Sequence, residues 1–380
     1  MTLGSMNASI EGGLLAENRF DLDITAAGPD ASVLTDAIGQ SMPADPFSVS
    51  THLAGGPEKL EFTNLDVTLG ISKVFGNLTV GLGETKRLSG NLESPHLDLR
   101  HWDTRSEDVE EKPDEPASRE WMFDDTPVAN RLPQNLNVDA EIKIDELIFT
   151  NTTVFDIALG IAMEENFLDL KPLTFRGLKG GSYVGEVLFD ARGLTPKLHF
   201  AASGKDVRSG FAAAPGQDPS TYPPFEYDIR LDGSGVTRRN MASSLDGKIR
   251  MYIGSGQVAE AGLSFMFSDF LTQLFTKLNP FLETSEYTQF DCGVFAADAV
   301  NGKVAVFPVI INTEQLTILS KGTVDLGTEE IDLSFNTKPR KGLGITAGTL
   351  INPLIKVGGR LTSPAVELDP AGTVTSTGLA

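Results

Sequence analysis

The chain has 380 residues, 40% of them hydrophobic, and its mean hydropathy of -0.07 is typical of a globular protein rather than a disordered one. A formal net charge of -21 excludes nucleic acid as an expected partner, because phosphate binding needs a basic face. Cys292 is the one cysteine, so no intramolecular disulfide can form, and the four histidines are too scattered in sequence to predict a metal site.

The start of the chain is not expected to be a secretory signal. The N-terminal sequence MTLGSMNASIEGG lacks the basic region and apolar core of a secretory signal. No stretch approaches the roughly 18 to 20 apolar residues of a membrane-spanning helix. Strand-like alternation begins almost at once, so we expect that the chain starts inside a longer protein. Any membrane association is then expected through a segment absent from this chain.

Composition divides the chain into four segments. Residues 1–102 are interpreted as an N-terminal β segment, the end of a longer upstream β region, with a short helix at 30–39. Residues 103–120 are acidic and contain prolines, so they cannot bury apolar surface and are predicted to form a flexible linker. Residues 121–369 form the main predicted β region, and 370–380 are predicted to be a loose tail.

Alternation of apolar and polar residues is the dominant pattern of the main region. Val138, Ala140, Ile142 and Ile144 alternate with polar and charged residues, which places them on one side of a strand. Clusters of Gly, Asn, Asp and Pro separate the strands, as in antiparallel meanders with one wet face. Further strands are predicted at 155–161, 167–173, 183–190, 197–202, 226–232, 245–253, 304–311, 316–326, 331–335 and 355–361.

Helices and a repeat complete the predicted fold. Apolar residues at helical spacing predict an amphipathic helix over 261–279, ended by Pro280, and a weaker one over 343–354. Residues 60–70 resemble residues 148–160, since both run from Phe-Thr-Asn into an alternating stretch that ends in Leu-Gly. The prediction is a mostly β protein, an extended antiparallel sheet built by repetition, with one or two amphipathic helices near its C-terminal part.

No pattern predicts catalysis. The chain has neither a Gly-x-Ser-x-Gly nucleophile motif nor a P-loop. Asp21 and Asp23 fall on the same side of an alternating strand, where both carboxylates are expected to face solvent. Cys292 has no histidine nearby in sequence and lies between apolar residues, so a buried structural thiol is expected. The sequence therefore predicts no catalytic residue, no metal ligand and no cofactor, and we expect a protein that is not an enzyme.

Several short motifs occur in a recognisable order across nearly three hundred residues. They are 65–80, 93–99, 121–127, 136–148, 167–173, 180–187, 290–295, 322–329, 331–333 and 357–364. In this order the chain resembles the AsmA family of Gram-negative envelope proteins. It departs from the family pattern in lacking the N-terminal membrane anchor and the upstream β region.

The resemblance implies a periplasmic protein anchored to the inner membrane in its full-length form and acting in outer-membrane biogenesis. It also implies a long, curled antiparallel sheet, a β-groove whose apolar concave face holds or conducts phospholipid or another acyl lipid. Ten residues are the candidates for the groove lining: Val138, Ala140, Ile142, Ile144, Ile157, Leu159, Val187, Phe189, Ile249 and Met251.

Three alternatives remain open at the level of sequence. The same residues could form the dry interior of a closed sandwich or pack against the helix at 261–279. The protein could be a scaffold or regulatory module that acts on envelope assembly through protein partners without binding lipid. A hydrolytic or carbohydrate-active β protein would need converging carboxylates or a metal in a cleft, which alternation alone cannot reveal.

Overall fold

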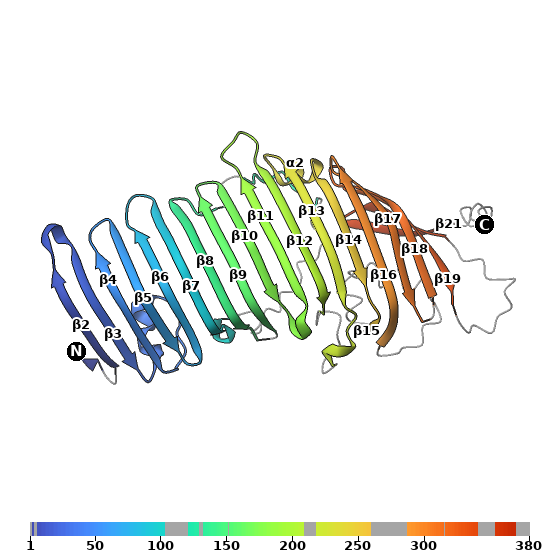
Figure 1. Ribbon diagram of the computed structural model, residues 1–380. Coiled ribbons are helices and arrows are strands. Elements are labelled where there is room, and N and C mark those ends of the chain that lie inside the picture. The colour runs from blue at the N-terminus through green and yellow to red at the C-terminus, as the bar shows by residue number, and fades with distance from the viewer. Residues whose placement is uncertain are drawn as a thin grey trace. The chain divides into compact units, whose positions relative to one another are not determined.

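The chain is mostly β, as its alternation predicts (Figure 1). The computed structural model describes residues 2–3, 6–102, 121–128, 132–150, 152–208, 218–259, 287–314, 316–340 and 354–369. The predicted linker at 103–120, the predicted helix at 261–279 and the predicted tail at 370–380 lie outside the described residues. The weaker helix prediction at 343–354 does too, except for its last residue, Leu354, which begins a strand.

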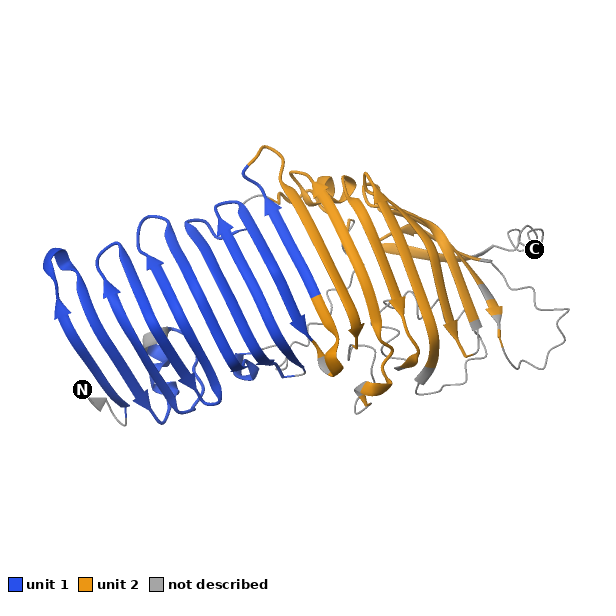
Figure 2. Cartoon of the chain, viewed as in Figure 1, with its two compact units in different colours: residues 1–111, 130–176, 184–192 blue, residues 112–129, 177–183, 193–380 orange. Residues whose placement is uncertain are grey.

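The chain divides into two compact units, coloured separately in Figure 2. Unit 1 comprises residues 1–111, 130–176 and 184–192, and unit 2 comprises residues 112–129, 177–183 and 193–380. Unit 1 therefore uses residues from both sides of the acidic stretch at 103–120, whereas unit 2 begins within that stretch.

Unit 1 is a sheet in which strands that follow each other in sequence lie side by side. Each strand from β1 to β10 pairs with the next in sequence, antiparallel in every case but one. Residues 184–190 of β11 (Ser182–Asp190) also belong to this unit. The strands are β1 (Thr2–Leu3), β2 (Met6–Leu14), β3 (Phe20–Gly28), β4 (Phe47–Gly55), β5 (Lys59–Leu69), β6 (Ser72–Gly81), β7 (Lys86–Asp98), β8 (Leu136–Ile148), β9 (Thr153–Glu164) and β10 (Phe167–Arg176).

Short helical turns connect the strands of unit 1. The helix predicted at 30–39 is present as a 3-10 turn, η2 (Ala31–Leu34), that continues into α1 (Thr35–Ile38). The Asp30 side chain accepts a hydrogen bond from the Ser32 N–H, and Gly39 ends the helix with a φ of 74°. Two further 3-10 turns are η1 (Ala16–Asn18) and η3 (Arg100–Trp102).

The purely antiparallel prediction is wrong at one place, because β7 and β8 pair in parallel. Parallel neighbours need a connection that runs back along the sheet. Residues 99–135 make this connection, and alternation within each strand carries no information about strand direction. The Trp102 indole N–H donates to the Ser41 carbonyl oxygen at 2.9 Å, which ties the start of the connection to the α1 region.

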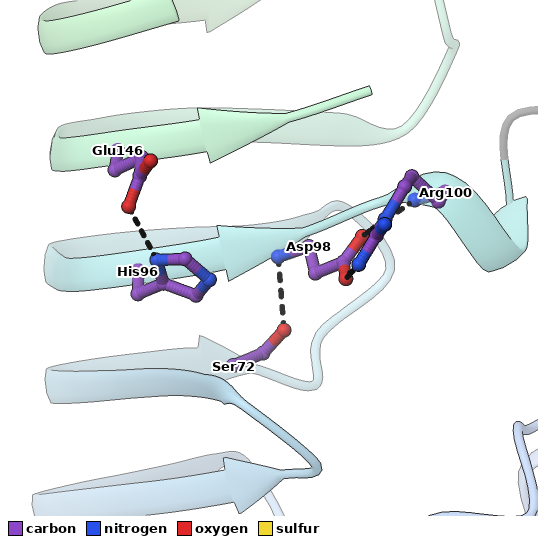
Figure 3. A network of polar contacts seen from close by, with 5 residues as sticks. All are labelled: Ser72, His96, Asp98, Arg100 and Glu146. Carbon is purple, nitrogen blue, oxygen red and sulfur yellow. Dashed lines mark hydrogen bonds and ion pairs between the residues drawn. The ribbon is translucent and has the colours of Figure 1, made fainter. Parts of the chain in front are cut away.

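Side chains fix the end of β7 where the connection begins (Figure 3). The His96 Nδ1 atom lies 2.6 Å from a carboxylate oxygen of Glu146 on β8, and the Asp98 N–H donates to the Ser72 hydroxyl at 2.9 Å. Arg100 donates to the Asp98 carboxylate, which holds the pKa of Asp98 below its ordinary value. Strands β6, β7 and β8 are thus joined by side chains as well as by the backbone ladder.

The predicted repeat does not have equivalent structures in its two copies. Residues 60–70 lie within β5 and its end, where Asn64 adopts a φ of 51° at an irregularity of the ladder. In residues 148–160 the same Phe-Thr-Asn sequence falls between β8 and β9. The pairing partners, rather than the local sequence, decide whether this motif bulges or turns.

Unit 2 is a second antiparallel arrangement. β14 and β15 both pair with β16, and the other strands pair with their neighbours in sequence. The strands are β12 (Lys197–Val207), β13 (Phe225–Ser234), β14 (Asp246–Ile253), β15 (Gly256–Ala259), β16 (Tyr287–Val300), β17 (Lys303–Thr313), β18 (Leu316–Asp325), β19 (Glu330–Pro339), β20 (Leu354–Arg360) and β21 (Ser363–Asp369). Its helical elements are η6 (Leu178–Gly180), η8 (Pro219–Thr221) and α2 (Arg238–Ser243), a short helix that the sequence did not predict.

Residues 121–128, here called the clamp segment, dock onto unit 2. The Trp121 ring lies between two guanidinium groups, 3.8 Å from that of Arg239 and 4.1 Å from that of Arg360. The buried carboxylate of Glu329 accepts hydrogen bonds from the N–H groups of Met122 and Phe123, at 2.9 and 2.6 Å.

The clamp segment also pairs with the approach to α2. The Val128 N–H donates to the Val236 carbonyl oxygen, and the Arg238 N–H donates to that of Thr126. The segment thereby joins α2 to the turn that follows β18 and to the end of β20.

Glu329→Ala is expected to lower the free energy of unfolding of unit 2 by about 2 to 3 kcal/mol, because two N–H groups lose a buried, charged acceptor. Glu330→Ala, at the exposed neighbouring position, is the matched control. Denaturant unfolding measures the energy, and hydrogen exchange at Met122 and Phe123 should accelerate only in the Glu329 variant. Equal exchange in the two variants would contradict this role.

Gly76→Ala is expected to destabilise unit 1 by about 1 to 3 kcal/mol. Gly76 has a φ of 149°, and an added Cβ would lie 2.1 Å from the carbonyl oxygen of Asn91 on β7. Gly13→Ala is the control, since nothing lies within 4 Å of a Cβ there. Thermal unfolding of both variants makes the comparison, and an equal change in the two melting temperatures would refute it.

Candidate functional site

Cross-strand pairing gives unit 1 one continuous apolar face. In an antiparallel or parallel ladder, residues directly opposite each other point to the same side of the sheet. Ile142 on β8 lies opposite Leu92 on β7 and Leu159 on β9, and the same side continues in both directions. The apolar face is defined here as this side of β2 to β10, including Ile10, Leu22, Ile24, Val49, Leu53, Phe62, Val67, Leu78, Leu88, Leu92, Val138, Ala140, Ile142, Ile144, Ile157, Leu159, Ile161, Leu168, Leu170 and Leu173.

The structure brings six of the ten candidate lining residues together on this face. Ile142 pairs with Leu159, and Ile144 pairs with Ile157. Val138 and Ala140 continue the same side of β8. All six are half-buried rather than enclosed.

No second sheet covers the apolar face in the part of the chain that the structure describes. Strands contact their sheet neighbours, and no described strand packs across the face as a second layer (Figure 1). At one edge, Ile10 and Leu14 on β2 are 67% and 88% exposed. Single exposed apolar residues are ordinary on protein surfaces, but a contiguous apolar surface indicates a binding site.

The other four candidates lie elsewhere. Val187 and Phe189 share one side of β11 and are half-buried. Ile249 and Met251 lie on β14 of unit 2, where Ile249 is paired with Ile229 and Met251 with Tyr227.

Unit 2 has a partly filled interior, in contrast to the apolar face of unit 1. One cluster contains Val207, Phe225, Ile253 and Phe290, and burial beside it raises the pKa of Tyr227. A second cluster contains Ile318, Phe335, Ile355 and Val357, of which Ile355 and Val357 are 0% and 1% exposed. These two clusters are local packed cores of unit 2, and Met251 packs against the first.

Sequence reasoning missed the N-terminal half of the apolar face. Ile24, Val49, Phe62 and Leu78 lie on β3 to β6, and each strand shows some alternation of apolar and polar residues. The alternation of apolar and polar residues is present in these strands, but glycines and the irregularity at Asn64 interrupt it. Pairing across the strands is what identifies these residues as one surface.

The opposite side of the same sheet, here called the polar face, carries paired charges. His52 lies 3.0 Å from a carboxylate oxygen of Asp23 and 3.5 Å from one of Asp21, so the two exposed aspartates predicted from sequence flank a histidine. His96 pairs with Glu146 in the same way. These contacts form between neighbouring strands, so they stabilise pairing rather than build a reactive centre.

Chemistry-bearing groups do not converge elsewhere in the described residues. No set of three or more His, Cys, Asp or Glu side chains there is placed to hold a metal ion. Cys292, expected to be buried, is only half-buried, and its Sγ accepts a hydrogen bond from the Asn312 amide at 3.3 Å. Its side of β16 is opposite to that of Gly293, which faces Ile253.

Two further comparisons, with membrane-spanning helices and with known proteins, gave no match. None of the described helices has the length and apolar character needed to cross a membrane. The chain matches no family model, no curated protein and no solved structure.

The pKa of His52 is expected to lie above its ordinary value of 6.5, because Asp23 hydrogen-bonds to the ring and stabilises the charged form. The pair then stabilises the fold fully below the pKa of the unfolded chain, and the contribution is lost as the pH rises through the folded pKa. Asp23→Asn should lower the pKa of His52 more than Asp21→Asn does, as measured by NMR titration of the ring. An unchanged titration in Asp23→Asn would contradict the assignment.

Proposed function

We propose that the protein binds acyl lipid on the apolar face of unit 1 and acts without covalent chemistry, as the periplasmic part of an AsmA-like protein in outer-membrane biogenesis. The observation that carries the proposal is the contiguous, half-exposed apolar face with no described strand packed over it. The motif order that resembles the AsmA family supports the same function. That resemblance is also the basis for proposing a curled β-groove and a membrane anchor outside this chain.

The size of the apolar face suits an acyl chain. β2 to β10 span eight strand intervals of about 4.8 Å each, or roughly 38 Å. The hydrocarbon core of a bilayer is about 30 Å thick and holds two acyl-chain lengths, so one chain needs about 15 Å. A single acyl chain therefore fits on the face with room to move.

The energetics allow an acyl chain to bind to the apolar face and still move along it. Each CH₂ removed from water contributes about 0.8 kcal/mol. Neighbouring positions on the face offer similar aliphatic side chains, such as Leu92, Ile142 and Leu159 in adjacent strands. A chain displaced by one strand spacing loses and gains similar contacts, so sliding requires no chemical step. Charged headgroups would stay in water at the edge of the sheet.

The alternative is a scaffold that acts through protein partners and carries no lipid. The same apolar face would then bind an apolar protein surface. Lipid is favoured because the face is aliphatic over many strands, whereas protein interfaces concentrate aromatic residues and arginine at their centres. The described lining is mostly leucine, isoleucine and valine. It contains no arginine, and its phenylalanines, Phe20, Phe47, Phe62 and Phe175, are spread over four strands.

The test is native mass spectrometry and lipid extraction of the protein purified from a Gram-negative periplasm. We expect co-purifying phospholipid, reduced at least about tenfold by the double variant Ile142→Asp/Leu159→Asp. The matched control is Ala158→Asp, which adds a carboxylate to the other side of β9 opposite Lys143.

Circular dichroism and denaturant unfolding establish that each variant is folded before lipid is quantified. Phospholipid lost equally in the control and the double variant would show that charge, rather than the face, matters. A folded wild-type chain that neither co-purifies with phospholipid nor binds phospholipid vesicles would overturn the proposal in favour of the scaffold.

A further inference from the structure

The polar face of unit 1 contains an aromatic ring among polar side chains. Phe75 on β6 is 36% exposed and points away from the apolar face, because it lies opposite Asp66 on β5 and Glu93 on β7. On this side of the sheet the phenyl ring cannot pack against the aliphatic side chains of the apolar face. It lines a hollow, here called the Phe75 hollow, with a volume of about 530 Å³.

Three asparagines surround the ring on adjacent strands. Asn77 and Asn91 are direct cross-strand partners, and Asn64 stands at the irregularity in β5 with a φ of 51°. The Asn64 N–H donates to the Asn77 Oδ1 at 3.2 Å, which orients the Asn77 amide. All three side chains are exposed, and each amide offers both a donor and an acceptor.

A second hollow adjoins the first. It has a volume of about 580 Å³ and shares Asp66 with the Phe75 hollow. Its walls are small polar or short side chains on β2, β3 and β4, including Ser9, Thr25, Ser48 and Ser50. The small side chains leave a depression that continues from the ring across the polar face.

The charges exclude two classes of ligand. Lys73 is the one cation of the Phe75 hollow, and it already pairs with Asp66 at 2.9 Å, while Glu93 adds a further negative charge. Phosphate and other anions are therefore disfavoured. A metal ion is disfavoured as well, because the described residues contain no set of three or more His, Cys, Asp or Glu side chains placed to hold one.

We propose that these joined hollows bind a neutral oligosaccharide, with one sugar ring stacked on Phe75. A pyranose presents a face of C–H groups, which packs on an aromatic ring, and a rim of hydroxyls. Those hydroxyls need closely spaced donors and acceptors, which the asparagine amides and the Asp66 and Glu93 carboxylates provide. The adjoining serine-lined hollow accommodates further sugars of the same chain.

The site is independent of the lipid proposal because it lies on the opposite side of the sheet. Ile142→Asp/Leu159→Asp should leave sugar binding unchanged, and Phe75→Ala should leave lipid binding unchanged. The two proposals can therefore fail separately.

The experiment titrates the ¹⁵N-labelled chain with the neutral hexasaccharides of cellulose, chitin and starch, each up to about 10 mM. At least one is expected to bind saturably and to shift the side-chain amide signals of Asn64, Asn77 and Asn91. Phe75→Ala should weaken this binding about tenfold or more, whereas Phe75→Trp should retain it.

Phe155→Ala is the control, since Phe155 lies on the polar side of β9, opposite Glu146 and outside the hollow. Because Phe75 is partly exposed, its replacement should leave the circular dichroism spectrum unchanged. The proposal is overturned if none of the three hexasaccharides binds, or if Phe75→Ala and Phe155→Ala weaken binding equally. Binding of a protein partner by the same hollow, without sugar, would also overturn it.

Discussion

The strict two-residue period of paired strands is the constraint on which the structure depends. Because partners across a ladder point to the same side, the register of the backbone hydrogen bonds alone places Leu92, Ile142 and Leu159 side by side. A slip of one residue would turn each of them to the charged side of the sheet. Irregularities such as that at Asn64 insert a residue and restore the alternation beyond it, so the sheet bends locally without exchanging its faces.

The same pairing gives one sheet two different surfaces. Aliphatic residues gather on one side, while Asp66, Phe75 and Glu93 form a row on the other. Neither surface needs a deep cavity or a converging set of reactive groups. Binding on such surfaces is distributed over many weak contacts, which suits long ligands that slide or exchange rather than small ligands that are enclosed.

Alternation in the sequence predicted the strands and the side to which their apolar residues point, because both are local properties of the chain. Ile142 and Leu159 could be placed on a common surface in this way. The parallel pairing of β7 with β8 could not be predicted from alternation, since strand direction depends on a connection of nearly forty residues. The contacts of Trp121 with Arg239 and Arg360 could not be predicted either, because both arginines are distant from it in sequence. The Phe75 hollow needed three strands in register before its parts became one site.

The clamp segment has a consequence for biosynthesis. It leaves the ribosome soon after β7, but the Glu329 carboxylate that accepts its Met122 N–H follows 207 residues later. At about 5 to 20 residues per second, that interval is roughly 10 to 40 seconds. During this time β8 to β11 can pair while the clamp segment has no Glu329 to bind. The clamp segment can therefore dock only after the chain has been synthesised as far as Glu329. A nascent chain that stalls earlier would leave Trp121 accessible to chaperones and proteases.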